Sequence, residues 1–181
     1  MMAKRIMFSY KFGTMDMDCC KDSTSSVNND FIKSLGFSMA PTDMTMDMHM
    51  FGTMHAISDK WTLMGMINYL DNEMSMQNGM AMESNGWGDV KLGGLYELAS
   101  TNDGRRTHLN LGVSLPTGSI DEKNSAGNVL GYGMQLGSGT WDFNPVITFL
   151  GQTDDYSWGA QFGGVLRIGE NDQDYSLGNR L

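Results

Sequence analysis

The chain has 181 residues and carries 12 Lys and Arg against 21 Asp and Glu, which gives a formal net charge of −9. This acidity argues against nucleic acid as a partner, because phosphate backbones are bound by clustered basic side chains. No apolar run approaches the roughly 18 residues that a membrane-spanning helix needs, so that class is excluded, whereas a membrane β-barrel is not.

Apolar and polar side chains alternate along the chain with a period of two, which is typical of strands with one apolar face. In the first segment Ile6, Phe8 and Tyr10 share one face, whereas Arg5 and Lys11 share the other. The pattern predicts seven strands and the start of an eighth, over residues 5–13, 43–57, 61–69, 89–98, 106–115, 140–149, 156–168 and 175–177.

The connections alternate in length. Three are short and carry Asn, Asp, Ser or Gly, as hairpin turns do: 58–59, 100–104 and 151–154. Three are long and polar, and we expect solvated surface loops there: 16–42, 71–85 and 117–137. Short turns at one end and long loops at the other are typical of an outer-membrane barrel.

Strand length and aromatic placement favour the same fold. The segments reach ten to fifteen residues, whereas globular strands average about five or six and tilted membrane strands need about nine to eleven. Trp61, Tyr69, Trp141, Phe149 and Tyr156 lie near strand ends on the apolar face, as interfacial aromatic residues do. We therefore predict an all-β, antiparallel, up-and-down transmembrane β-barrel, with a lipocalin-like barrel or a sandwich as alternatives. Residues 1–181 are expected to form one domain that is truncated at both ends.

Several motifs resemble a known family. They are Gly-Asp-Val-Lys-Leu-Gly at 88–93, Pro-Thr-Gly-Ser at 116–119, and the segments 15–18, 40–50, 110–120 and 134–140. Together they resemble the transporter-like outer-membrane barrels grouped as "MetA-pathway of phenol degradation" proteins. The resemblance implies a Gram-negative outer-membrane location and the passage of small, often aromatic or apolar, compounds.

Charged residues on the polar face are the candidate lumen-lining residues. They are Arg5, Lys11, Asp47, His49, Asp89, Lys91, Glu97, Arg106, His108, Asp142 and Arg167. Both signs occur together, so they either pair and fill a narrow interior or line an aqueous path and set its selectivity. We expect pairing for most of them.

Methionine, with 18 residues, is the most unusual component. A row at Met44, Met46, Met48 and Met50 offers soft thioethers that favour Cu(I). Alternate residues on one strand are nearly 7 Å apart, however, so one ion spans two of them at most. We expect a lipid-facing stripe there. A second candidate site for a soft metal is the inward-facing rim formed by Met15, Met17, Cys19 and Cys20.

The sequence does not favour an enzyme. Its three histidines lie in no H-E-x-x-H motif, and it contains no Gly-x-Ser-x-Gly nucleophile elbow. The predicted function is an outer-membrane channel or transporter-like barrel, with outer-membrane lipid and a small-molecule solute as partners and no required cofactor. The alternatives are a methionine-rich barrel that binds copper without transport and a structural or adhesive barrel.

Overall fold

The computed structural model describes residues 5–18, 21–22, 25–27, 29–34, 41–101, 103–173 and 177–181. The strands of the main sheet are β1 (Ile6–Asp18), β4 (Pro41–Ala56), β5 (Trp61–Met76), β6 (Ala81–Trp87), β7 (Val90–Ser100), β8 (Arg106–Leu115), β9 (Trp141–Gln152), β10 (Ser157–Gly163) and β11 (Leu166–Ile168). The smaller elements are β2 (Lys21–Asp22), β3 (Ser25–Ser26), α1 (Asn29–Ser34) and the 3-10 helix η1 (Tyr132–Met134).

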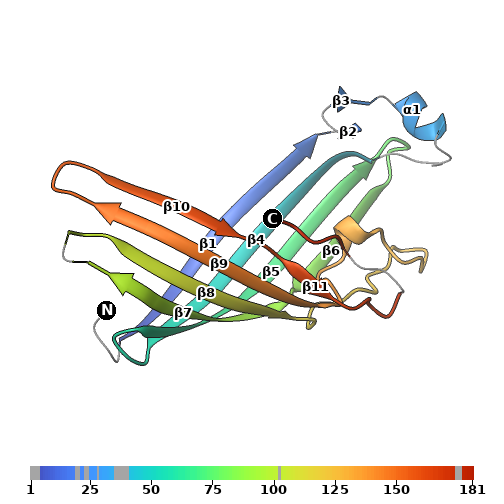
Figure 1. The fold of residues 1–181 in the computed structure, drawn as a ribbon. Coiled ribbons are helices and arrows are strands. Elements are labelled where there is room, and N and C mark those ends of the chain that lie inside the picture. Colours follow the sequence, from blue (N-terminus) through green and yellow to red (C-terminus); the bar gives the residue numbers. More distant parts are fainter. Residues whose placement is uncertain are drawn as a thin grey trace.

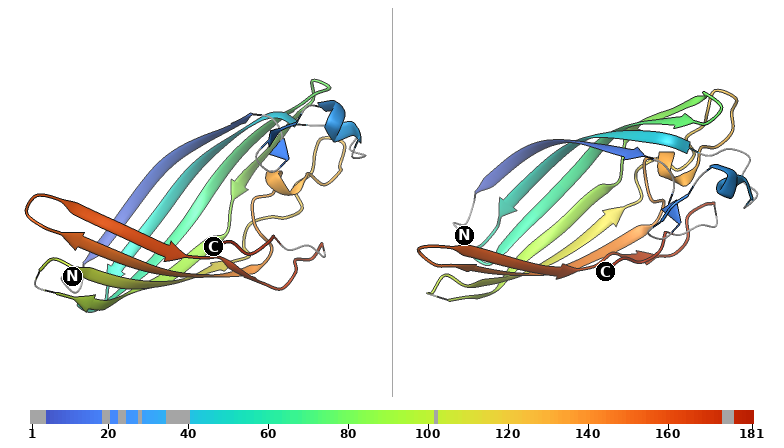
Figure 2. Two further views of the ribbon diagram at one scale, coloured as in Figure 1. Left: turned by 45° about the horizontal axis from the view of Figure 1, so that its top comes forward. Right: turned by 90° about the horizontal axis from the view of Figure 1, so that it is seen from above.

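The sheet is antiparallel throughout and curls into a half-barrel (Figures 1 and 2). Its strand order is β1-β4-β5-β7-β8-β9-β10, so the strands of this path follow one another in chain order. The short strands β2, β3, β6 and β11 lie off the path. Strands β6 and β7 follow one another along β5, and β10 and β11 follow one another along β9. Within the described residues, β1 and β10 are the edges, and no pairing joins them.

The all-β, up-and-down prediction is therefore confirmed, and one predicted loop is wrong. Residues 71–85 form a hairpin in which β5 and β6 stay paired from Tyr69↔Trp87 to Ser75↔Ala81. This region alternates too, but its outward positions include Asp71 and Glu73 instead of apolar residues. The apolar pattern therefore ends before the strand does.

The start of an eighth strand, predicted at 175–177, falls largely outside the described residues. The chain rejoins the sheet at Arg180, whose backbone pairs with Val165 in an antiparallel bridge. The Oδ1 atom of Asn179 also accepts a 2.9 Å hydrogen bond from the backbone N–H of Arg167. None of the helices in the described part of the chain is long and apolar enough to cross a membrane.

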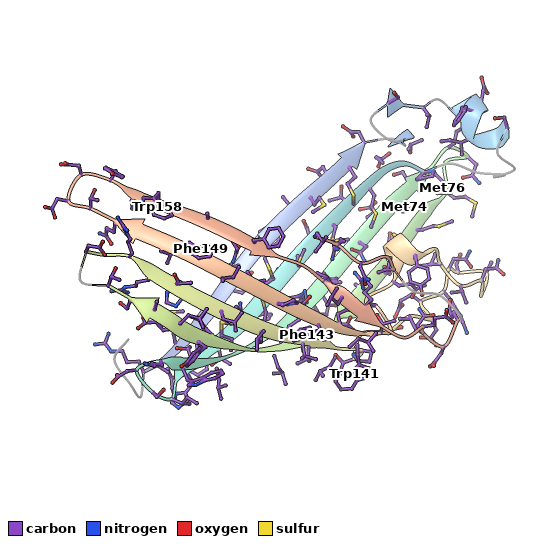
Figure 3. The ribbon with its side chains drawn as sticks, viewed as in Figure 1. Met74, Met76, Trp141, Phe143, Phe149 and Trp158 are labelled. Atoms are coloured by element: carbon purple, nitrogen blue, oxygen red, sulfur yellow. The ribbon has the colours of Figure 1, made fainter. Side chains whose placement is uncertain are left out.

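The two faces of the sheet differ in chemistry. Directly opposed residues of an antiparallel pair share a face, so the register assigns every strand residue to one side. One face carries exposed apolar side chains such as Phe8, which is 81% exposed, and Trp141. The other face carries nearly all the buried polar side chains of the strands, among them Asn72 and Ser114. We call these the convex and concave faces, and Figure 3 labels Trp141 and Phe143 from the first and Met74 and Met76 from the second.

Aromatic side chains form a belt across the convex face. Phe12, His49, Tyr69 and Trp87 are directly opposed across β1, β4, β5 and β6. Their rings are in contact, with centroids 5.1 Å apart for Phe12 and His49 and 5.4 Å for Tyr69 and Trp87. Eight residues earlier on β5, the Trp61 ring contacts the Tyr96 ring of β7 in a tilted arrangement, with centroids 4.8 Å apart. Aromatic residues therefore mark both ends of the apolar part of β5.

Candidate functional site

A hollow of about 480 Å³ occupies the middle of the concave face. Its lining comes from most strands of the sheet and includes Ser9, Lys11, Met54, Met64, Met66, Lys91, Asn110, Ser114, Asn144, Val146 and Arg180. The hollow exists partly because Gly93 and Gly112, directly opposed on β7 and β8, place no side chain over the sheet. Thioether, amide, hydroxyl and charged side chains therefore surround a glycine-lined floor.

The hollow has a cationic character in an acidic protein. The side chains of Lys11 and Lys91 line it, and within the described residues neither forms an ion pair. Asp142 also reaches the hollow, but its carboxylate accepts a 3.0 Å hydrogen bond from Arg167 Nη1, and both side chains are buried. The hydroxyl of Thr140 donates to the other carboxylate oxygen at 2.8 Å. The negative charge of Asp142 is thus already neutralised.

Asp89, between β6 and β7, anchors the long segment that joins β8 to β9. One carboxylate oxygen accepts the backbone N–H of Gly118 at 2.9 Å. The other accepts the backbone N–H and the hydroxyl of Ser138, at 2.9 and 2.8 Å. A Cβ on Gly118 would lie 2.7 Å from the Cα of Gly137, so the two ends of the segment pass each other with no room for a side chain. Three sequence motifs, at 88–93, 116–119 and 134–140, therefore meet at one carboxylate.

The anchored segment folds onto the concave face at Leu130 and 134–136, so the expectation of a solvated surface loop at 117–137 is wrong for this part, whereas 125–129 is exposed as expected. Met134 is only 1% exposed and, with Leu130, packs against Met44 of β4. The hydroxyl of Ser84 donates to the carbonyl oxygen of Met134 at 2.6 Å, and Asn72 Nδ2 donates to that hydroxyl at 3.1 Å. The segment therefore covers one end of the concave face, beside the hollow.

Most of the predicted lumen-lining charges lie on the concave face. These are Arg5, Lys11, Lys91, Glu97, Arg106, His108, Asp142 and Arg167. Glu97 is directly opposite His108, which is buried, and Asp142 pairs with Arg167. Lys11 and Lys91 lie in the hollow, whereas Asp89 holds backbone groups of the covering segment. Whether these residues line a passage stays a prediction.

The structure corrects two of the predicted lumen residues. Asp47 is directly opposite Thr14 and Asp71, and His49 is directly opposite Phe12 and Tyr69, so both point to the convex face. The ring of His49 belongs to the aromatic belt, and a 2.9 Å hydrogen bond joins its Nδ1 to the Tyr10 hydroxyl.

The expectation that the β4 methionine row faces lipid is wrong for the same reason. The row comprises Met44, Met46, Met48 and Met50, which share the concave face with Met17, Met15, Gly13 and Lys11 of β1. Every methionine of the described strands lies on this face. Methionine is apolar, so hydrophobicity alone placed these side chains with lipid, whereas the register puts Met50 opposite Lys11 and Asn68.

The predicted soft-metal rim is only partly described. Met15 and Met17 do point to the concave face, where they oppose Met46 and Met44. Cys19 and Cys20 lie outside the described residues. Metal binding at this rim stays a prediction, as does the absence of a required cofactor.

Asn72, Ser84 and Met134 were not singled out from the sequence. Asn72 is completely buried, and together the three connect the covering segment to β5 and β6. Their only sequence signal is the continued alternation through 71–85, which puts Asn72 and Ser84 on the methionine side. Met134 carries no local signal, because its position depends on the anchor at Asp89.

The fold and its faces define a class: an antiparallel, up-and-down barrel wall with an apolar outer face and a polar, methionine-lined inner face. Within that class, the family described as "Putative MetA-pathway of phenol degradation" matches residues 38–181, and the chain belongs to it. None of the curated proteins with which the chain was compared matches it.

Proposed function

We propose that the chain forms part of the wall of an outer-membrane barrel, whose concave face lines a passage for small aromatic or apolar compounds. The observation that carries the proposal is the separation of the two faces. The convex face exposes large apolar side chains, among them Phe8, Leu92 and Phe162. Exposing so large an apolar surface to water is unfavourable, whereas contact with lipid suits it.

The dimensions of the convex face support a membrane location. Trp61 and Tyr69 are eight residues apart on β5, or roughly 26 Å at 3.3 Å per residue. At the usual strand tilt of about 40° this is an apolar band about 20 Å tall, close to the ~25 Å band of outer-membrane barrels. Beyond the belt, Asp47, Asp71 and Glu73 occupy the convex face, as expected where a strand leaves the bilayer. In such a wall the edges at β1 and β10 must pair with further strands, because unpaired peptide groups do not face lipid.

The lining of the hollow supports a preference among solutes. Thioether and aliphatic side chains such as Met64, Met66 and Val146 offer adaptable apolar contacts, and Lys11 and Lys91 add unpaired positive charge. This combination suits a small aromatic compound that carries an acidic oxygen, such as a phenol or an aromatic carboxylate. The name of the family, with its reference to phenol degradation, agrees with this preference.

Flux measurements with the protein reconstituted in liposomes test the proposal. We expect benzoate to enter faster than benzyltrimethylammonium, a cation of similar size. The Lys11→Glu/Lys91→Glu variant should reverse this order, whereas Lys60→Glu, in the turn between β4 and β5, should leave it unchanged. Failure of both solutes to enter, with the protein correctly inserted, would reject the passage. Entry in an order that ignores the two lysines would reject their role in selection.

A further inference from the structure

Five methionines from four separate segments gather at the covered end of the concave face. Met44 and Met46 come from β4, Met74 from β5, Met82 from β6 and Met134 from the covering segment. Met44 is 8% exposed and Met134 is 1% exposed, and the other three pack against the buried group that these two form with Leu130. We call these five side chains the methionine cluster.

The sheet register brings the thioethers together where a single strand could not. Met44 is directly opposite Met74, and Met74 is directly opposite Met82. Opposed residues have Cβ atoms about 4.5–5.5 Å apart, compared with nearly 7 Å between alternate residues on one strand. Methionine has three rotatable side-chain bonds, so the sulfurs of neighbouring strands can approach one another across this row. Met134 approaches from the covering segment and supplies a fourth.

The surroundings of the cluster favour a soft monovalent cation. Asn72 and Ser84, the buried polar side chains next to it, are neutral; Asn72 Nδ2 donates to the Ser84 hydroxyl, which donates to the Met134 carbonyl, and Asn72 Oδ1 is buried without a hydrogen-bond partner. Within the described residues, no group of three or more His, Cys, Asp or Glu side chains is placed to hold a metal. The described side chains therefore offer Zn²⁺ no set of His, Cys or carboxylate ligands and Mg²⁺ no set of carboxylates, whereas thioethers are soft ligands that select Cu(I).

Charge near the cluster also favours a cation. Glu73 and Glu83 are directly opposed on the convex side of β5 and β6, next in sequence to Met74 and Met82. With a net charge of −9, the protein attracts cations to this end without placing a carboxylate in the cluster itself.

We propose that Met44, Met74, Met82 and Met134 form a thioether site for one Cu(I) ion, with Met46 beside it. The ion stays in the cuprous state, so binding involves no electron transfer and releases no proton. The site requires the register of β4, β5 and β6 and the anchored covering segment, and it does not depend on the chain acting as a passage.

Matched leucine variants test this proposal, because leucine is close to methionine in volume and lacks only the sulfur. The test variant is Met44→Leu/Met74→Leu/Met82→Leu. The control is Met50→Leu/Met64→Leu/Met66→Leu, which makes the same change at concave positions of β4 and β5 outside the cluster. Both are titrated with Cu(I) under anaerobic conditions against a chromogenic Cu(I) chelator. Circular dichroism and heat-modifiable gel migration establish that each variant is folded.

We expect the native protein to bind one Cu(I), the control to keep that affinity, and the test variant to lose at least about 100-fold. That loss is the upper end of what removing a supporting partner costs a metal site. X-ray absorption of the loaded native protein should show sulfur as the only nearest neighbour. Equal affinity in the folded test and control variants, or nitrogen and oxygen neighbours around copper, would overturn the proposal. If the test variant does not fold, the absorption spectrum of the native protein still decides.

Discussion

The convex and concave faces of this half-barrel share the same strands and the same period of two, yet their side chains obey different rules. On the convex face, aliphatic and aromatic residues predominate between the aromatic belt and the Trp61–Tyr96 pair. On the concave face, methionine is interleaved with Lys, Asn, Ser and Gly. The comparison shows that an apolar side chain does not identify the outer face by itself. Aromatic residues do so here, whereas methionine accompanies the polar residues inside, together with a few aliphatic residues such as Val146.

The buried ion pair on the concave face gives the largest expected effect. Asp142→Ala leaves the Arg167 guanidinium without its partner. Water cannot replace that partner, because the Arg167 side chain is only 7% exposed. Removing one member of a buried pair costs about 3–5 kcal/mol of folding free energy. Urea unfolding in detergent micelles should show this loss, and the double change Asp142→Leu/Arg167→Met should recover most of it. A single variant as stable as the native protein would mean that the pair is open to water.

A charged residue introduced midway along the strands should destabilise the two faces to very different extents. Leu92 is half exposed on the convex face and lies opposite Gly65, midway between Trp61 and Tyr69. If that face contacts lipid, Leu92→Arg costs about 2–4 kcal/mol, whereas Met64→Arg, on the concave face, costs much less. Unfolding from liposomes measures both variants. Equal costs would contradict the assignment of the faces.

The anchor of the covering segment is expected to contribute less. Asp89→Ala removes the acceptor for two backbone N–H groups and the Ser138 hydroxyl. Leaving such donors unsatisfied costs about 1–3 kcal/mol. Hydrogen exchange should become faster in the segment between β8 and β9 while the strands stay protected. Loss of protection throughout the sheet would show that Asp89 supports the whole fold.

The smallest effect concerns Asp103, in the turn between β7 and β8. The Thr101 hydroxyl donates to its carboxylate, and this hydrogen bond, with the nearby Arg105, lowers the pKa of Asp103 below 3.8. Because the pKa is lowered in the folded state, the ionised carboxylate stabilises the turn at pH values above the ordinary pKa. This stabilisation is lost as the pH falls through the folded-state pKa. Asp103→Asn should therefore speed amide exchange in the turn at pH 6, and the difference from the native protein should shrink as the pH falls below 3.8. A difference that persists in acid would point to another cause.

The sequence predicted the strands well because each one alternates apolar and polar residues between recognisable turns. Its errors have one physical source. Alternation assigns residues to two faces but does not say which face of one strand joins which face of the next. That choice depends on register: Asp47 and His49 were placed inside, and Met44 to Met50 outside, because the pairing of β4 with β1 and β5 was unknown. The covering segment was missed for a similar reason, since contacts such as Ser84 to Met134 join residues 50 positions apart.

The assignment of faces is the central claim, and neighbouring residues of β4 test it most directly. Met50 and Phe51 are adjacent in the chain and at similar depth, but they lie on the concave and convex faces. Each is replaced by cysteine in a background with Cys19→Ser and Cys20→Ser, reconstituted in liposomes and treated with a membrane-impermeant maleimide. The account predicts rapid labelling of the Met50→Cys protein and little labelling of the Phe51→Cys protein. The reverse order would contradict this assignment and would mean that the methionine row of β4 faces lipid.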